Sequence, residues 1–143
     1  MAKRKASATW KGTLKEGTGS VALGSGAFQG AYSFQSRFES GQGTNPEELI
    51  GGALAACFSM ALAHDLDEAG YTPEKIETTA HVSFDPVGEG FKITTILLET
   101  QGTVPDVEEK VFIEHAEKAS KNCPAAQALA AAEISVKARV QSS

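Results

Sequence analysis

Three observations predict an α+β fold. Residues 1–43 are rich in turn residues and contain short alternating segments. Residues 46–68 follow as one long, largely apolar helical pattern. The rest of the chain places two alternating segments before, and one after, two shorter helical segments. Three strands, a helix, two strands, two helices and a strand are an order typical of α+β proteins.

The N-terminal third is expected to form an antiparallel meander. Its strands are predicted at residues 6–13, 20–24 and 32–38, because apolar and polar side chains alternate there. The runs Lys-Glu-Gly at 15–17 and Gly-Ser-Gly at 24–26 supply turn residues between strands.

The long helix has clear start and stop signals. Residues 44–46 (Thr-Asn-Pro) offer a capping side chain followed by a proline suited to the first helical position. The glutamates at 47–48 suit the positive end of the helix dipole. The helix is expected to run to about Glu68, with Gly70 as its stop.

The C-terminal half is expected to form three strands and two helices. The predicted strands are residues 75–84, 91–100 and 134–140, and the predicted helices are residues 107–121 and 124–131. Residues 86–90 are expected to form the turn between the first two strands. Pro124 breaks the first helix and opens the second.

Size and composition indicate one ordinary soluble domain spanning residues 1–143. Hydrophobic residues make up 41% of the chain and charged residues 22%. The net charge of −5 argues against nucleic-acid binding, which needs a basic face. No signal-length apolar stretch follows the basic start, and the apolar run at 50–63 is shorter than the ~20 residues that span a bilayer. We therefore expect a cytoplasmic protein without a membrane partner, whose thiols are kept reduced.

The apolar helix also predicts an oligomer. The run at 50–63 is apolar on nearly every side, so most of its surface should be buried. Two small sheets in one subunit offer little material to surround it. A second subunit is expected to complete the burial in an obligate homodimer.

Cys57 is the most informative residue, and two interpretations of it remain open. The only other cysteine is Cys123, and no Cys/His spacing suggests a zinc site. Cys57 can be an inert core residue, since free cysteine is often buried and an apolar setting disfavours the thiolate. It can instead be a reactive thiol. It lies too far from the start of its helix for the dipole to activate it, so the reactive interpretation needs a cation from elsewhere.

Arg37 is the candidate cation, and Glu47 is the carboxylate that could hold its guanidinium by a bidentate contact. Either residue could instead be simply solvated, or compensate the helix dipole. Ten residues separate Glu47 from Cys57, a rise of about 15 Å in a straight helix. Either the glycines at 51–52 bend the helix, or Glu47 reaches the site from a dimer partner. We favour the second; an Arg37–Glu47 contact within one subunit would contradict it.

Cys123 lies at a helix break directly before Pro124. The N-terminus of the following helix could lower the thiol pKa, and the break could let the side chain move. Such a thiol could condense with a sulfenic acid on Cys57. A buried packing cysteine is the equally open alternative.

Several runs at matching spacing resemble the OsmC-like family of osmotically inducible and organic hydroperoxide resistance proteins. The resemblance covers nearly the whole chain. It is carried by Arg-Phe-Glu at 37–39, Gly-Thr-Asn-Pro-Glu-Glu-Leu-Ile-Gly at 43–51, Ala-Ala-Cys-Phe-Ser-Met-Ala-Leu at 55–62, Glu-Ala-Gly-Tyr-Thr-Pro at 68–73 and Asn-Cys-Pro at 122–124.

The resemblance implies an intertwined α+β homodimer with two active sites at the subunit interface. It implies a cysteine peroxidase without haem, metal or flavin. Cys57 then matches the peroxidatic thiol and Cys123 the resolving thiol. Glu47 matches the glutamate that binds an activating arginine, and Arg37 resembles the position of that arginine in the OsmC branch.

The implied activity is reduction of organic hydroperoxides, and more weakly of hydrogen peroxide, in oxidative or osmotic stress defence. Cys57 would become a sulfenic acid, Cys123 would form the disulfide, and an external dithiol, such as a lipoyl-bearing protein, would reduce it. Apolar lining from Leu54, Phe58, Met60 or the second helix would favour an alkyl tail. Two rivals remain: a non-catalytic stress-induced dimer that binds a small apolar ligand, and a redox sensor.

Overall fold

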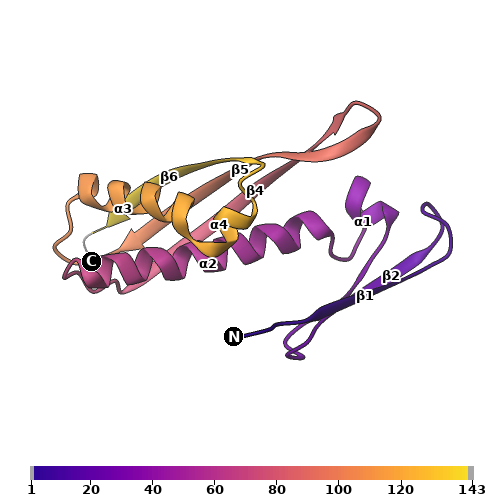
Figure 1. Ribbon diagram of the computed structural model, residues 1–143, viewed down its shortest axis with the longest axis horizontal. Coiled ribbons are helices and arrows are strands. Elements are labelled where there is room, and N and C mark those ends of the chain that lie inside the picture. The colour runs from indigo at the N-terminus through magenta and orange to yellow at the C-terminus, as the bar shows by residue number, and fades with distance from the viewer. Residues whose placement is uncertain (1, 142–143) are drawn as a thin grey trace. The chain divides into compact units, whose positions relative to one another are not determined.

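The computed structural model describes residues 2–141, and they divide into two compact units (Figure 1). Of the described residues, 2–49 belong to the first unit and 50–141 to the second. The elements in chain order are β1 (Ala6–Lys11), β2 (Thr18–Leu23), β3 (Gln29–Tyr32), α1 (Phe34–Phe38), α2 (Pro46–Glu68), β4 (Lys75–Val87), β5 (Gly90–Thr103), α3 (Glu109–Asn122), α4 (Pro124–Ala128) and β6 (Glu133–Gln141). The predicted α+β class is confirmed.

The described part of the first unit forms the predicted antiparallel meander, in the order β1-β2-β3. Gly19 of β2 lies opposite Trp10 on one side and Tyr32 on the other. A Cβ at Gly19 would come within 2.6 Å of both aromatic rings, so only glycine leaves room for them. The two ring centres are 5.4 Å apart, and the pair packs over Gly19 near one end of the sheet.

The predicted strand at 32–38 is wrong beyond Tyr32, because residues 34–38 form the short helix α1. Ser33 and Ser36 make a reciprocal capping box: the Ser36 N–H donates to Ser33 Oγ at 3.1 Å, and the Ser33 N–H donates to Ser36 Oγ at 2.8 Å. Alternation misled the prediction, since Phe34 and Phe38 also lie four residues apart on one helical face. Their ring centres are 4.9 Å apart.

The observed bounds of helix α2 match the predicted ones. Asn45 caps it, with its Oδ1 accepting from the Glu48 N–H at 2.8 Å. At the other end Gly70 adopts a φ of 94°, which glycine tolerates best, and the Tyr71 N–H returns to the Leu66 carbonyl at 2.9 Å. By length and composition alone α2 could also cross a membrane, a test that core helices of soluble proteins pass as well.

The second unit is built on a sheet in the order β4-β5-β6, within the described residues. β4 and β5 are antiparallel, whereas β5 and β6 are parallel and are joined by a crossover through α3 and α4. The strands are longer than predicted: Pro86 pairs with Phe91 and Val87 with Gly90, so the turn at 86–90 shrinks to residues 88 and 89. Helix α4 is shorter than predicted and ends at Ala128.

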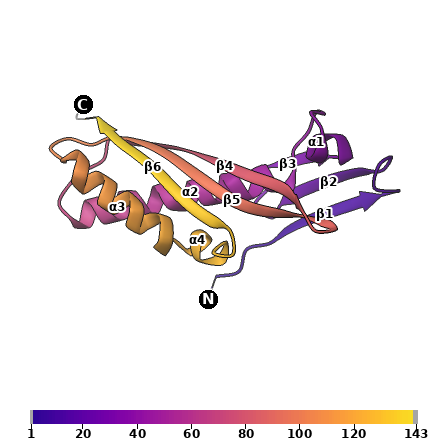
Figure 2. The ribbon, with the colours of Figure 1, turned by 90° about the horizontal axis from the view of Figure 1, so that it is seen from above.

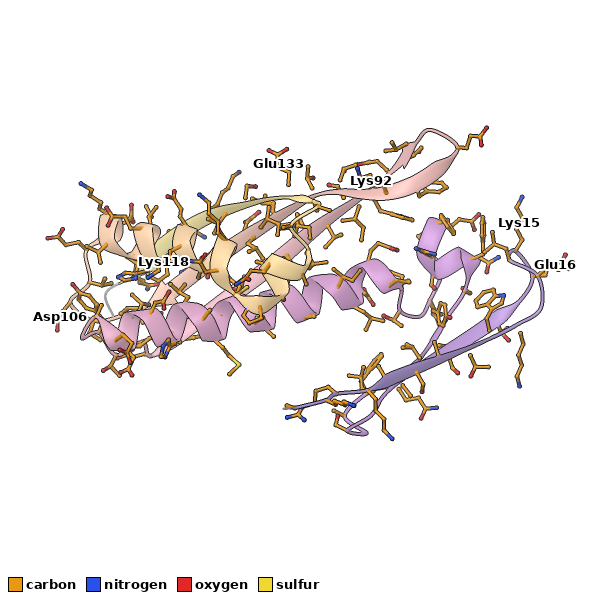
Figure 3. All side chains as sticks on the ribbon, viewed as in Figure 1. Lys15, Glu16, Lys92, Asp106, Lys118 and Glu133 are labelled. Carbon is orange, nitrogen blue, oxygen red and sulfur yellow. The ribbon has the colours of Figure 1, made fainter. Side chains whose placement is uncertain are left out.

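The three helices of the second unit lie against one face of its sheet (Figures 1 and 2). Polar side chains occupy the other face, where Glu133 projects away from the helices (Figure 3). The core lies between the layers, and most of its described residues are fully buried. They are Leu54, Phe58, Leu62, Leu66, Ile96, Leu98, Val104, Val107, Phe112, Ala116, Ala119, Cys123 and Ala126.

Helix α2 places its core leucines and phenylalanine at every fourth residue, so a single stripe faces the sheet. A second stripe remains exposed and is also apolar: Gly52, Ala53, Ala56 and Met60. Met60 is 76% exposed. The expectation that α2 is buried on most sides therefore does not hold within one chain.

Candidate functional site

The two cysteines are brought together by the second unit. Cys57 lies in the middle of α2 and is half-buried, while Cys123, only 2% exposed, lies between α3 and α4. Both are free thiols. The Ala125 N–H, two residues beyond Cys123, points at Cys57 Sγ with an N–S distance of 3.5 Å. The helix break predicted at Pro124 therefore carries Cys123 to the helix that holds Cys57.

Burial raises the pKa of Cys123 above its ordinary value of 9.0. Hydrogen bonding and negative charge at Cys57 raise this pKa further, while the peptide N–H groups of Ala126 and Ala125 lower it by less. The expectation of a lowered pKa is therefore wrong, because desolvation outweighs the peptide donors. Cys123 is a protonated thiol at neutral pH.

Arg37 and Glu47 form a bidentate ion pair in the first unit. Arg37 Nε donates to Glu47 Oε1 at 3.2 Å, and Nη2 to Oε2 at 3.0 Å. Glu47 is only 7% exposed. The pair lies within one chain, so the hypothesis that Glu47 would have to come from a partner to meet Arg37 is wrong.

The local fold explains this contact. Because residues 34–38 are helical and not extended, the chain turns back toward the start of α2. Ser36 fixes the return: its Oγ donates to the Thr44 carbonyl at 2.7 Å, and its carbonyl accepts from Asn45 Nδ2 at 3.3 Å. The last turn of α1 and the first turn of α2 thus hold the arginine and the glutamate side by side.

An aromatic cavity of about 190 Å³ lies beside Arg37 in the first unit. Lys15, at the turn between β1 and β2 (Figure 3), places its Nζ 5.9 Å from the centre of the Phe34 ring. Sequence analysis missed this cavity, because its aromatic side chains come from separate elements. The lining residues are Trp10, Leu14, Tyr32, Ser33, Phe34, Arg37 and Phe38.

The predicted apolar lining is partly wrong. Leu54 and Phe58 are completely buried in the core and cannot contact a substrate, whereas Met60 lies on the exposed stripe of α2. Within residues 2–141, no group of three or more His, Cys, Asp or Glu side chains is arranged to hold a metal ion.

Two free thiols, one on a long helix and the other in a turn that contacts it, are the arrangement expected of a cysteine-based redox protein. The chain belongs to the OsmC family, since the OsmC-like protein family matches residues 39–139. It is 50% identical over 129 residues to peroxiredoxin OsmC of Escherichia coli K12, covering 90% of each chain. It is also 32% identical over 88 residues, or 60% of each chain, to organic hydroperoxide resistance protein-like 2 of Staphylococcus saprophyticus.

Solved structures agree with this fold. The organic hydroperoxide resistance protein OhrB of Bacillus subtilis superposes with a TM-score of 0.71 and 25% identity, covering 96% of this chain and 98% of that one. An organic hydroperoxide resistance protein OsmC from Legionella pneumophila gives a TM-score of 0.74 and 25% identity, over 99% of both chains. The predicted family and the OsmC-like fold are confirmed.

Proposed function

We infer that this chain is a thiol-dependent peroxidase that reduces organic hydroperoxides. The main structural support is the hydrogen bond from the Ala125 N–H to Cys57 Sγ, because this bond shows that the turn containing Cys123 lies against Cys57. Half of the aligned residues are identical to those of a peroxiredoxin over 90% of the chain, which supports the same activity.

The chemistry needs two thiols used in order. The Cys57 thiolate attacks the distal oxygen of R–O–OH, the O–O bond breaks, and the alkoxide takes a proton and leaves as an alcohol. Cys57 is then a sulfenic acid. The Cys123 thiol attacks its sulfur, the S–O bond breaks, and water leaves as the disulfide forms. An external dithiol restores both thiols and is itself oxidised to a disulfide; a lipoyl-bearing protein is our candidate.

A homodimer would bring the Arg37–Glu47 pair to Cys57 of a second chain. Within one α2 helix, Glu47 and Cys57 are about 15 Å apart along the axis. Gly52 is the midpoint between them, so two antiparallel α2 helices crossing at Gly52 would set residue 47 of one beside residue 57 of the other. Among residues 2–141, and apart from the adjoining turns of α2 itself, nothing lies within 4 Å of a Cβ built at Gly52, which supports close approach of a second helix.

The exposed apolar stripe of α2 supports the same dimer. Ala53, Ala56 and Met60 continue the surface that starts at Gly52, and an apolar stripe of this kind favours association. A partner that supplies Glu47 alone is thus replaced by one that supplies both side chains. The partner would supply the arginine and the glutamate together, as a pair already formed within its own first unit.

The aromatic cavity supports a preference for organic hydroperoxides. Its volume of about 190 Å³ suits a small alkyl or aryl group, and Arg37 lines it. Hydrogen peroxide has no group to fill this cavity and would gain nothing from it. We place the enzyme in the cytoplasm, where dithiol reductants are available.

Single-turnover oxidation tests the function directly. The reduced protein is mixed with one equivalent of cumene hydroperoxide or of hydrogen peroxide, and mass spectrometry follows the Cys57–Cys123 disulfide. We expect stoichiometric disulfide, formed faster with the organic peroxide. Full peroxide consumption by a Cys57→Ser variant would favour a non-catalytic ligand-binding dimer. Disulfide formation too slow to remove peroxide would favour a sensor.

A further inference from the structure

The aromatic cavity of the first unit is walled by two pairs of rings from separate elements. Trp10 and Tyr32 come from the sheet, with ring centres 5.4 Å apart and ring planes inclined at 47°. Phe34 and Phe38 come from α1, with ring centres 4.9 Å apart and ring planes inclined at 36°. The cavity volume of about 190 Å³ exceeds the roughly 150 Å³ of an engineered protein cavity that binds benzene. One aromatic ring with a small substituent therefore fits inside it.

Glycines in and just before β2 make room for the Trp10 ring. A Cβ built at Gly19 would come within 2.6 Å of Trp10 Cε3, and one built at Gly17 within 2.9 Å of Trp10 Nε1. The indole N–H donates to the Gly12 carbonyl at 3.1 Å. The ring thus lies close against glycine backbone, and a hydrogen bond fixes its polar end. This wall of the cavity is held in place before any ligand arrives, which lowers the entropy cost of binding.

The cavity offers contacts that an aromatic ring uses better than an aliphatic group does. Its two polar side chains are engaged with other groups, since Ser33 Oγ caps α1 and Arg37 donates to Glu47. Arg37 Cζ lies 5.4 Å from the centre of the Phe38 ring, so a guanidinium already contacts an aromatic ring at this wall. Ring–ring and cation–ring contacts favour an aryl group by about fivefold over an aliphatic group of equal area.

We propose that this cavity binds an aryl group, so that the preferred substrates are arylalkyl hydroperoxides and Trp10 and Phe34 are the residues that determine this specificity. The inference rests on the proposed function and narrows its substrate class. An alkyl group of the same size would fill the cavity without stacking on its rings. The aryl group of such a substrate stays in the alcohol product, so the alcohol is a ligand of the cavity as well.

Trp10 is the only tryptophan of the chain, so its fluorescence reports on the cavity without any peroxide. The reduced protein is titrated with 2-phenyl-2-propanol, the alcohol formed from cumene hydroperoxide, and we expect a saturable change in Trp10 fluorescence. The matched ligand, 2-cyclohexyl-2-propanol, has nearly the same size but no aromatic face. Measured by competition, it should bind about fivefold more weakly. Equal affinities for the two alcohols, or no saturable change, would overturn the proposal.

Phe34→Leu removes one aromatic wall and leaves the Trp10 reporter in place. This variant should reduce the preference for the phenyl alcohol to about twofold or less. Phe28→Leu is the matched control, because Phe28 is an aromatic residue of the same unit, is 38% exposed and is not among the residues that line the cavity. Its preference should equal that of the wild type. A wild-type preference in Phe34→Leu would contradict the role assigned to this ring.

The effect on the reaction is measured with cumene hydroperoxide and with the hydroperoxide of the cyclohexyl alcohol. The ratio of the two Cys57 oxidation rates should fall about fivefold from the wild type to Trp10→Leu, a comparison in which the intrinsic reactivities of the peroxides cancel. An unchanged ratio, with the Cys57–Cys123 disulfide still formed in a single turnover, would overturn this inference and leave the proposed function standing. Full peroxide consumption by Cys57→Ser, with the alcohols binding as expected, would overturn the proposed function and leave the aryl site standing.

Discussion

The two units of the chain differ in the exposure of their ionisable groups and in the partners of those groups. The first unit holds a partly exposed arginine against a buried glutamate: the Arg37 side chain is 36% exposed and the Glu47 side chain 10% exposed. The second unit holds its sulfurs against the core, with Cys123 only 2% exposed and the Ala125 N–H donating to Cys57 Sγ. The comparison teaches that the strong cation and the reactive thiols are built separately. Each is held by contacts within its own unit.

The largest expected effect concerns the two cysteines of the second unit. Cys57→Ser should abolish peroxide consumption, because Cys123, the other thiol, is buried and has a raised pKa. Cys123→Ser should still complete one turnover and stop at the Cys57 sulfenic acid, which dimedone labelling and mass spectrometry detect. Disulfide-free turnover by Cys123→Ser at the wild-type rate would show that Cys123 only packs.

The next largest effect concerns the Arg37–Glu47 ion pair of the first unit. Arg37→Ala should lower the rate of Cys57 oxidation about a hundredfold, because the thiolate loses a charge-assisted partner. Glu47→Gln should cost about tenfold, since the guanidinium stays but loses its ionic clamp. Stopped-flow fluorescence or competition with a peroxide probe measures both rates. Arg37→Lys is the control for charge without the planar fork, and a rate equal to that of the wild type would argue against the bidentate geometry.

A mixed dimer sharpens the comparison further. Subunits with Cys57→Ser and subunits with Arg37→Ala are each expected to be inactive or nearly so on their own. The two variants are unfolded together and refolded as a mixture. If the charged pair acts across the dimer, each heterodimer has one complete site, and activity returns to about a quarter of the wild-type value. If the pair acts within one chain, mixing restores nothing. Analytical ultracentrifugation of the same sample reports the dimer, and sedimentation with liposomes would reveal a membrane-bound state of α2 instead.

The smallest effect concerns pH. The raised pKa of Cys123 means that its thiolate becomes abundant only above about pH 9, so disulfide formation from the Cys57 sulfenic acid should accelerate as pH rises through this range. The stability of the fold responds to rising pH in the opposite direction. A buried thiol with a raised pKa contributes stability below the unfolded pKa of 9.0, and this contribution is lost as pH rises through the folded value. Cys123→Ser should flatten the alkaline part of the denaturation curve, measured by urea unfolding.

The elements with local signals were predictable from the sequence. The asparagine cap, the proline and the terminal glycine fix both ends of α2, and Pro124 marks the break that carries Cys123. Residues 34–38 were mispredicted because a two-serine capping box leaves little trace beside an alternating pattern.

What depends on distant residues was not predictable. The parallel pairing of β6 with β5 and the aromatic cavity both join residues far apart in the sequence. The Arg37–Glu47 contact was expected as a pair, but its place within one chain follows from the fold-back of α1 through Ser36. The contact from Ala125 to Cys57 Sγ is made by a backbone N–H, so no residue type could have signalled it.

The parallel pairing of β5 with β6 has a consequence for the order of events during synthesis. The turn at Cys123 belongs to the crossover between these strands, and β6 is made last. A crossover packs firmly onto its sheet only after the second strand has joined. We therefore expect the two sulfurs to come together only once β6 has been synthesised and has joined the sheet.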